Sequence, residues 1–152
     1  MSEKECIGWR EWVLLPDLTA TPIKAKVDTG AKTSAIHAFF VEEVIRDNTS
    51  WVRFGLHPKQ KALDPECICE AKVLDKRTVT DSGGHKEDRF VIETAVNLGG
   101  HTVLTEMTLT NRETMLFRML LGRNTMAGRF IVDPEASFLC GGDADSGPGM
   151  PN

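Results

Sequence analysis

The sequence lacks the long apolar runs, the basic excess and the cysteine density that mark several large classes of protein. It has 152 residues, 41% hydrophobic and 26% charged, which is the balance of one ordinary globular domain. No segment approaches the roughly 18–20 apolar residues that cross a bilayer. The net charge of -4 gives no general basic surface for nucleic acid. Because residues 1–5 are charged and form no apolar signal segment, we expect a cytoplasmic protein without membrane or nucleic-acid partners.

Cysteine and histidine are sparse, and their spacing argues against a disulfide scaffold or a typical zinc site. Cys67 and Cys69 form a C-x-C pair, tighter than the C-x2-C of structural zinc sites. Cys6 and Cys140 stand alone in the sequence. The four histidines form no H-E-x-x-H or H-x-H pair: His37, His57, His85 and His101. We therefore predict reduced thiols and no metal or other cofactor. For His37 three roles stay open: lining a cleft, binding a metal, or a half-buried structural position.

Helix signals are scarce, and strand signals dominate. Residues 22–28 alternate strictly, which places Ile23, Ala25 and Val27 on one face of a strand. Further strands are predicted at residues 9–15, 51–56, 73–79, 89–96, 101–109, 130–134 and 137–139, and an apolar run covers 115–121. The turn residues at 80–86 predict a long hairpin, 57–64 a loop insertion, and 124–129 a short helical turn. The pattern indicates an all-β domain, a barrel or a closed sandwich-like sheet, over residues 1–140, with a flexible tail at 141–152.

The clearest local motif is Asp-Thr-Gly-Ala at residues 28–31, directly after the alternating strand. A strand that ends in this way can present the Asp28 carboxylate at a cleft. Thr29 can fix the loop through its hydroxyl, and Gly30 allows close approach of another backbone. Taken alone, the motif is also compatible with an ordinary turn.

A second motif lies far downstream, where Leu121 and Gly122 precede Arg123 and Asn124. Together the two motifs resemble the retropepsin fold of aspartic peptidases, in which an apolar-apolar-Gly strand crosses behind the Asp-Thr-Gly loop. The resemblance covers about residues 23–130 and implies a closed acid-protease barrel, with one lobe per chain and one short C-terminal helix. It also implies a flap hairpin, with Ser82, Gly83 and Gly84 at its tip.

A closer resemblance is to a bacterial and archaeal family catalogued as ATP-dependent zinc proteases. It is carried by residues 26–38, and by the blocks at 7–11, 88–92 and 109–123. The family is retropepsin-like and is often associated with ATP-grasp ligases that add glutamate to proteins. The chain itself contains no G-x-x-x-x-G-K-[ST] phosphate loop.

The resemblance implies an aspartic-type endopeptidase acting on peptide or isopeptide-type amide bonds. Such chemistry needs two carboxylates that share a proton across a water molecule, and the chain has a single Asp-Thr-Gly. We therefore expect a homodimer in which Asp28 of each protomer contributes to one dyad. Thr29 and Gly30 would complete the catalytic loop. Ala31, Lys32 and the three flap-tip residues would contact substrate.

Lys32 stands where the viral enzymes carry an acidic residue that pairs with the arginine of Gly-Arg-Asn. Lys24 and Lys26 share the Asp28 side of their strand, so the substrate predicted here is an acidic, glutamate-rich peptide or protein. A plain solvated lysine face is the alternative. Two other functions also stay open: a retropepsin-like binding domain without catalysis, and a zinc-dependent hydrolase.

Overall fold

The computed structural model describes residues 4–59, 66–80, 83–111 and 116–141. Its elements in chain order are β1 (Glu5–Ile7), β2 (Arg10–Leu15), β3 (Thr19–Val27), β4 (Ser34–His37), β5 (Phe40–Arg46), β6 (Thr49–Leu56), β7 (Cys67–Lys72), β8 (Asp75–Thr80), β9 (Lys86–Leu98), β10 (His101–Thr110), β11 (Met119–Leu121), α1 (Arg123–Met126) and β12 (Phe130–Val132). The predicted all-β class with one short helix is therefore confirmed. Of the predicted tail, only Gly141 lies within the described residues.

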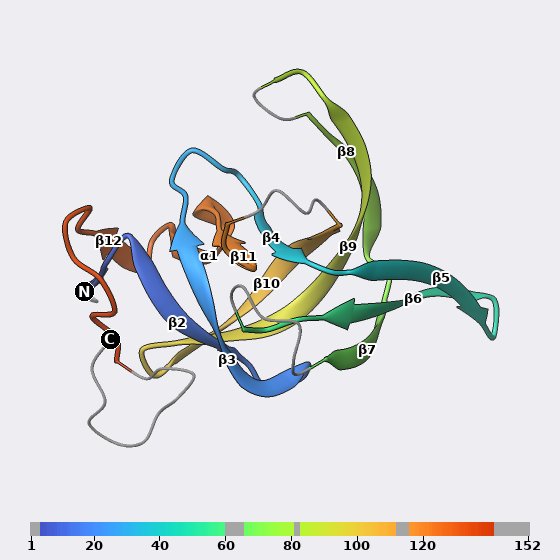
Figure 1. Ribbon diagram of the computed structural model, residues 1–152, viewed down its shortest axis with the longest axis horizontal. Helices are drawn as coiled ribbons and strands as arrows, with labels where there is room; N and C mark the ends of the chain where they lie inside the picture. Colours follow the sequence, from blue (N-terminus) through green and yellow to red (C-terminus); the bar gives the residue numbers. More distant parts are fainter. Residues whose placement is uncertain (1–3, 60–65, 81–82, 112–115, 142–152) are drawn as a thin grey trace.

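The strands form three sheets rather than one closed barrel, which corrects that part of the prediction. The largest sheet has the order β10-β4-β11-β3-β2-β9-β8, and β9 also pairs with β10. It therefore curls back on itself, but β2 and β9 pair only at Leu14 and Asn97. Strands β5, β6 and β7 form a separate sheet that extends away from the body, and β1 and β12 form a third (Figure 1).

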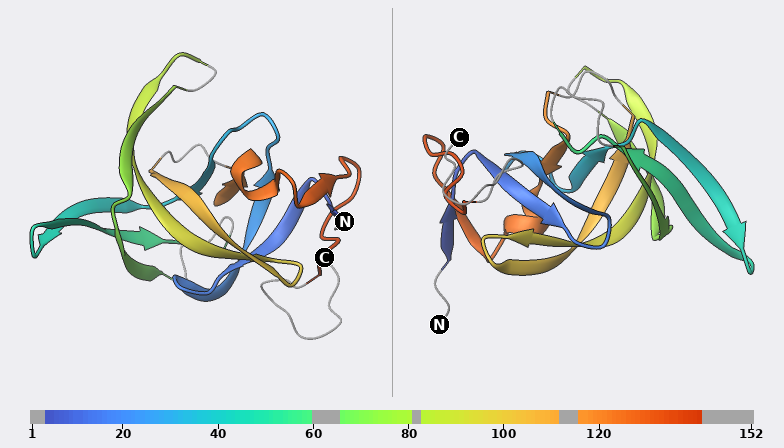
Figure 2. Two further views of the ribbon diagram at one scale, coloured as in Figure 1. Left: turned by 180° about the vertical axis from the view of Figure 1, so that it is seen from behind. Right: turned by 60° about the horizontal axis from the view of Figure 1, so that its bottom comes forward.

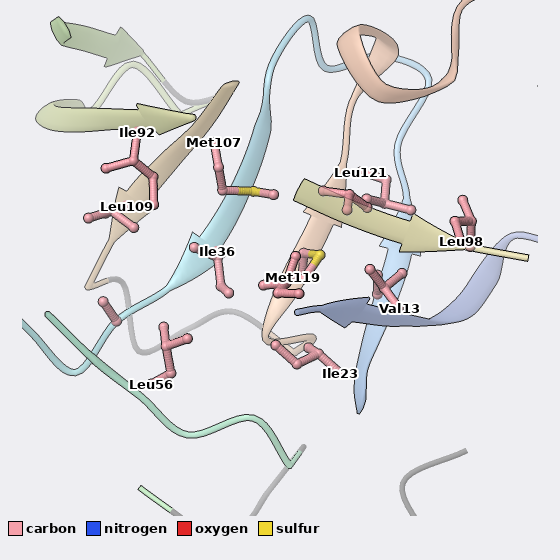
Figure 3. Packing of buried hydrophobic residues seen from close by; sticks show 14 of the residues in the cluster. Val13, Ile23, Ile36, Leu56, Ile92, Leu98, Met107, Leu109, Met119 and Leu121 are labelled. Atoms are coloured by element: carbon pink, nitrogen blue, oxygen red, sulfur yellow. The ribbon is translucent and has the colours of Figure 1, made fainter. Parts of the chain in front are cut away.

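The buried face of β3 is the one that the alternating sequence predicts. Ile23 and Ala25 are fully buried and Val27 is nearly so. In Figure 3 the side chains of Ile23, Ile36, Met107, Met119 and Leu121 converge on one interior from β3, β4, β10 and β11. Fully burying an aliphatic side chain of this size contributes about 1.5–3 kcal/mol. The core therefore lies directly behind the end of β3, where the Asp-Thr-Gly motif begins.

Two hairpins leave this body in different directions. The predicted hairpin of β8 and β9 is confirmed, with six antiparallel pairs from Asp75↔Val91 to Thr80↔Lys86. Figure 2 shows it curving away from the core on the side opposite the chain termini. The hairpin of β5 and β6 turns at Asp47 and Asn48, both with positive φ, as a two-residue loop requires.

The segment after β12 differs from the strand predicted at 137–139. Ser137 makes only an isolated bridge with Arg10, and Phe138 has a φ of 56°. The segment is held by the fully buried carboxylate of Glu11, which accepts hydrogen bonds from the backbone N–H groups of Leu139 (2.9 Å) and Cys140 (3.1 Å). Backbone hydrogen bonds add to this, from the N–H of Trp9 to the Ala136 carbonyl and from the N–H of Phe138 to the Arg10 carbonyl, but they do not extend into a ladder.

None of the described helices is long and apolar enough to span a membrane.

Candidate functional site

The Asp28 turn is fixed by backbone hydrogen bonds on both sides of the motif. The N–H of Val27 donates to the Trp9 carbonyl (2.8 Å), and the N–H of Asp28 donates to the Leu121 carbonyl (2.9 Å). The Asp28 Oδ1 accepts a hydrogen bond from the N–H of Gly30 at 3.0 Å. The turn itself is open, since Gly30 and Thr29 are exposed and Asp28 is half-buried. The geometry thus presents one carboxylate at the surface on a rigid support.

The downstream motif lies behind this turn, as its resemblance to retropepsins implied. Strand β11 is parallel to β3, with Leu121 opposite Val27, and antiparallel to β4. Gly122 follows, and a Cβ at this position would lie 2.7 Å from the backbone carbon of Thr33. The N–H of Arg123 then donates to the Ala31 carbonyl at 2.8 Å. The absence of a side chain at Gly122 is what allows the two segments to cross.

Arg123 binds a neutral group. The acidic residue with which the corresponding arginine of the viral enzymes pairs is Lys32 in this chain. The guanidinium Nη1 of Arg123 donates to the backbone carbonyl of Thr29 at 2.9 Å. The arginine therefore still ties the start of α1 to the Asp28 turn, through a backbone oxygen rather than an ion pair.

Ser34 is a site residue that the sequence analysis did not single out. Its buried hydroxyl lies 2.9 Å from Asn124 Oδ1 and 2.7 Å from Thr125 Oγ1, and accepts the N–H of Gly122 at 2.9 Å. Asn124 Nδ2 in turn donates to the Glu106 carbonyl at 2.8 Å. This Ser34 network joins β4, α1 and β10 behind the turn. A small hydroxyl among apolar strand residues was the signal that could have revealed it.

Lysines on the Asp28 side differ in what they contact. Lys24 Nζ lies 5.3 Å from the centre of the Trp12 ring and 5.8 Å from that of Phe138, so it is engaged in cation–π contacts. Lys26 and Lys32 are exposed. Lys32 also lines a pocket of about 520 Å³ that lies against β8 and β10. Of the predicted cationic face, Lys32 thus adjoins a cavity.

The predicted flap tip is only partly described. Ser82 lies outside the described residues, and Gly83 and Gly84 form a turn before β9, with Gly84 at a φ of 84°. A glycine suits that backbone, because other residues rarely adopt positive φ.

The remaining candidates are distributed over separate elements. His37 is buried on β4, with Nδ1 3.4 Å from Arg118 Nη1, and burial lowers the pKa of Arg118. Burial, followed by the nearby Cys67, raises the pKa of Cys69 to about 11. All four cysteines are free thiols. Among the described residues, no group of three or more histidine, cysteine or carboxylate side chains is placed to hold a metal ion.

An Asp-Thr-Gly turn backed by a crossing Leu-Gly strand defines a retropepsin-like domain. Residues 6–141 match the family model described as "RimB-like: Retropepsin-like aspartic endopeptidase RimB". The chain therefore belongs to the RimB-like family. A crystal structure of a Legionella pneumophila protein of unknown function agrees with this fold, with a TM-score of 0.76 and 25% identity over 91% of this chain and 100% of that one.

Curated relatives of this chain are named as ligases. A Shewanella halifaxensis protein named "Probable alpha-L-glutamate ligase" is 45% identical over 142 residues, which cover 93% of this chain and 31% of that protein. A Parasynechococcus marenigrum protein of the same name is 43% identical over 141 residues, covering 93% of this chain and 30% of that protein. The chain thus spans about a third of the length of these relatives.

These names correct the predicted activity. The two motifs predicted an aspartic-type endopeptidase, and hence a hydrolase and protease, whereas relatives that match most of the chain are named as ligases. The word endopeptidase in the family description does not outweigh them, because the Asp28 turn and its crossing strand are features of a fold. A fold does not determine the reaction. One chain also supplies only one such turn, which is half of a two-carboxylate dyad.

Proposed function

We propose that this chain serves α-L-glutamate ligation as the domain that binds the glutamate-bearing polypeptide. The observation that carries the proposal is the 43–45% identity, over more than nine-tenths of the chain, to one third of proteins named as alpha-L-glutamate ligases. Joining an amino acid through an amide requires activation of a carboxylate, which is assigned here to the other two thirds of those relatives. The retropepsin-like third then has the task of holding the acceptor.

The site geometry supports an acidic polypeptide as the bound partner. A growing glutamate chain carries one carboxylate per residue and is attracted to fixed positive charge. Lys32 lies four residues beyond Asp28 and is exposed beside a pocket, on a loop whose backbone is held by the N–H of Asn124 at 3.1 Å. An extended peptide that passes the open turn would therefore meet a positioned ammonium group.

The proposed setting is the cytoplasm, where thiols stay reduced and ATP is available for ligation. The four free cysteines suit that compartment. The homodimer that the single Asp-Thr-Gly predicts stays a prediction, and the proposed binding does not require it.

A domain exchange tests the proposal. In the Shewanella halifaxensis relative, the homologous 142-residue segment is deleted or replaced by this chain, and glutamate incorporation into an acidic acceptor peptide is measured. We expect the deletion to raise the KM for the acceptor peptide at least about tenfold, because binding energy for the acceptor is lost. Replacement by this chain should bring the KM most of the way back to its original value. The KM for ATP should not change.

A matched control is replacement by this chain with Lys32→Glu, which should restore the fold but not the acceptor KM. An acceptor KM that is the same with and without the segment would refute the proposed role.

A further inference from the structure

The pocket beside Lys32 has walls from four parts of the chain, one of which is α1 with Asn124. The loop after the Asp28 turn contributes Lys32 and Thr33, β8 contributes Arg77 and Val79, and β10 contributes Glu106. Its volume of about 520 Å³ lies in the range of small-molecule and side-chain sites. The pocket thus joins the Asp28 turn to the hairpin of β8 and β9, so a ligand at the turn can reach it.

Arg77 is held in a fixed orientation at this pocket by two carboxylates. Its Nε donates to Asp75 at 2.8 Å, and its Nη2 contacts Glu106 at 2.9 Å. These contacts raise the pKa of Arg77, so it stays charged at every physiological pH. A guanidinium has five N–H donors, and two contacts leave others to face a ligand.

Lys32 provides the second positive charge. No ion pair involving Lys32 is found among the described residues, although it stands on a loop with a fixed backbone. Counting the lining side chains, two cations face one carboxylate, Glu106, whose backbone carbonyl is itself bound by Asn124. With Asp75 also bound to Arg77, two carboxylates balance the two cations here, and Lys32 is the cation that has no ion pair among the described residues.

The rest of the lining suits an aliphatic stem that ends in a carboxylate. Val79 offers an apolar contact for methylene groups, while the Thr78 hydroxyl is occupied, since it donates to Asp88 at 2.7 Å. The two positive groups are the strongest available donors for a carboxylate, because charge-assisted hydrogen bonds are about twice as strong as neutral ones.

We propose that this pocket is a subsite for the side-chain carboxylate of a glutamyl residue in an α-linked oligoglutamate chain, with Lys32 and Arg77 as its specificity-determining residues. The inference rests on the proposed function and extends it, since it names the residues that distinguish glutamate from its neutral analogue glutamine. Asp75 and Glu106 act as positioning residues for Arg77.

Binding of fluorescein-labelled hexa-α-glutamate, measured by anisotropy on the full chain, tests the subsite, with labelled hexaglutamine as the neutral comparison. We expect Lys32→Gln to weaken hexaglutamate binding at least about tenfold and to leave hexaglutamine unaffected, because one charge-assisted contact is lost. Arg77→Gln should have a similar effect. Lys32 is exposed, so its variant should keep the wild-type unfolding midpoint.

The matched control is Lys76→Gln, which removes the same charge from the neighbouring residue of β8. Lys76 Nζ lies 5.2 Å from the centre of the Phe90 ring and does not line the pocket. We expect Lys76→Gln to change the Kd for hexaglutamate at most about twofold, since a charge outside the pocket is screened by salt. If Lys32→Gln and Lys76→Gln weaken binding equally, the subsite is refuted while the proposed function stands. If the unaltered chain does not bind hexaglutamate, both are refuted.

Discussion

Two regions that adjoin the pocket, called its two walls below, are built by different kinds of interaction. Behind the Asp28 turn, Ser34, Gly122 and Asn124 are joined by neutral hydrogen bonds in a buried setting. On β8, Arg77 forms ion pairs with Asp75 of the same strand and with Glu106 of β10, and these side chains are 38–48% exposed. Neutral buried bonds fix a backbone independently of salt and pH, while exposed ion pairs are screened and adjustable. The Ser34 side therefore fixes the geometry of the backbone, and the Arg77 side supplies charge for recognition.

The largest effect is expected at the crossing point. Gly122→Ala would place a Cβ 2.7 Å from the Thr33 carbonyl carbon and 2.9 Å from its oxygen, both backbone atoms that cannot rotate away. We expect a loss of about 3 kcal/mol in the free energy of unfolding, or failure to fold, measured by urea denaturation.

The control for this variant is Gly30→Ala, where the new Cβ would meet only Asp28 Oδ1 at 3.3 Å. Because that atom is the end of a side chain, the expected loss is below about 1 kcal/mol. Equal losses at Gly30 and Gly122 would mean that the crossing is not the rigid element.

The next effect concerns the Ser34 network. Ser34→Ala removes the hydroxyl that accepts the Gly122 N–H and contacts Asn124 and Thr125, and leaves buried polar groups without a partner. A loss of about 2–3 kcal/mol is expected in urea denaturation. Thr78→Ala deletes an exposed hydroxyl on the other wall and should cost less than about 0.5 kcal/mol. If Thr78→Ala lost more stability than Ser34→Ala, the Ser34 side would not be the rigid one.

An intermediate effect is expected at alkaline pH. Burial raises the pKa of Cys69 from its ordinary 9.0 to about 11, so above pH 9 the unfolded chain releases this proton while the folded chain keeps it. The unfolded state then binds fewer protons, and stability falls as the pH rises from about 9 to about 11. Cys69→Val should flatten this limb of the stability profile. An unchanged slope in that variant would contradict the raised pKa.

The smallest effect is expected at the ion pair that joins β5 and β7. Arg46 Nη2 lies 2.7 Å from Glu70 Oε2 on an exposed face. Because exposed pairs contribute little, Arg46→Gln should leave the urea midpoint unchanged within error. A clearly lower urea midpoint in Arg46→Gln would show that exposed ion pairs contribute substantially to the stability of this protein.

Local patterns in the sequence predicted the parts of the fold that depend on neighbouring residues. The alternation at residues 22–28 predicted the buried face of β3, and the turn residues near 83–84 predicted the hairpin of β8 and β9. Strand β7 was not predicted, because the charged residues Glu70 and Lys72 gave its segment a polar character. It is a half-buried strand at the edge of a small sheet. Asp47 and Asn48 were the available signal for the hairpin that precedes it.

The site was predictable only in part, because the pocket depends on contacts between distant segments. The motifs at residues 28–31 and 121–124 identified the turn and the strand behind it. The approach of Arg77 and Glu106 to Lys32 depends on how β8 and β10 pack, which no local pattern encodes. The activity was predicted wrongly, since the same turn occurs in a chain whose relatives are named as ligases.

Strands β1 and β12 pair in parallel, with Glu5 opposite Phe130, and Glu11 holds the backbone at Leu139 and Cys140 nearby. The first and last described segments of the domain therefore lie together, as Figure 1 also shows. Linking residues 4 and 141 through a short loop would cost little closure entropy, so a circularly permuted chain should fold. In a longer protein, a domain built in this way can be inserted at a single position of the neighbouring chain.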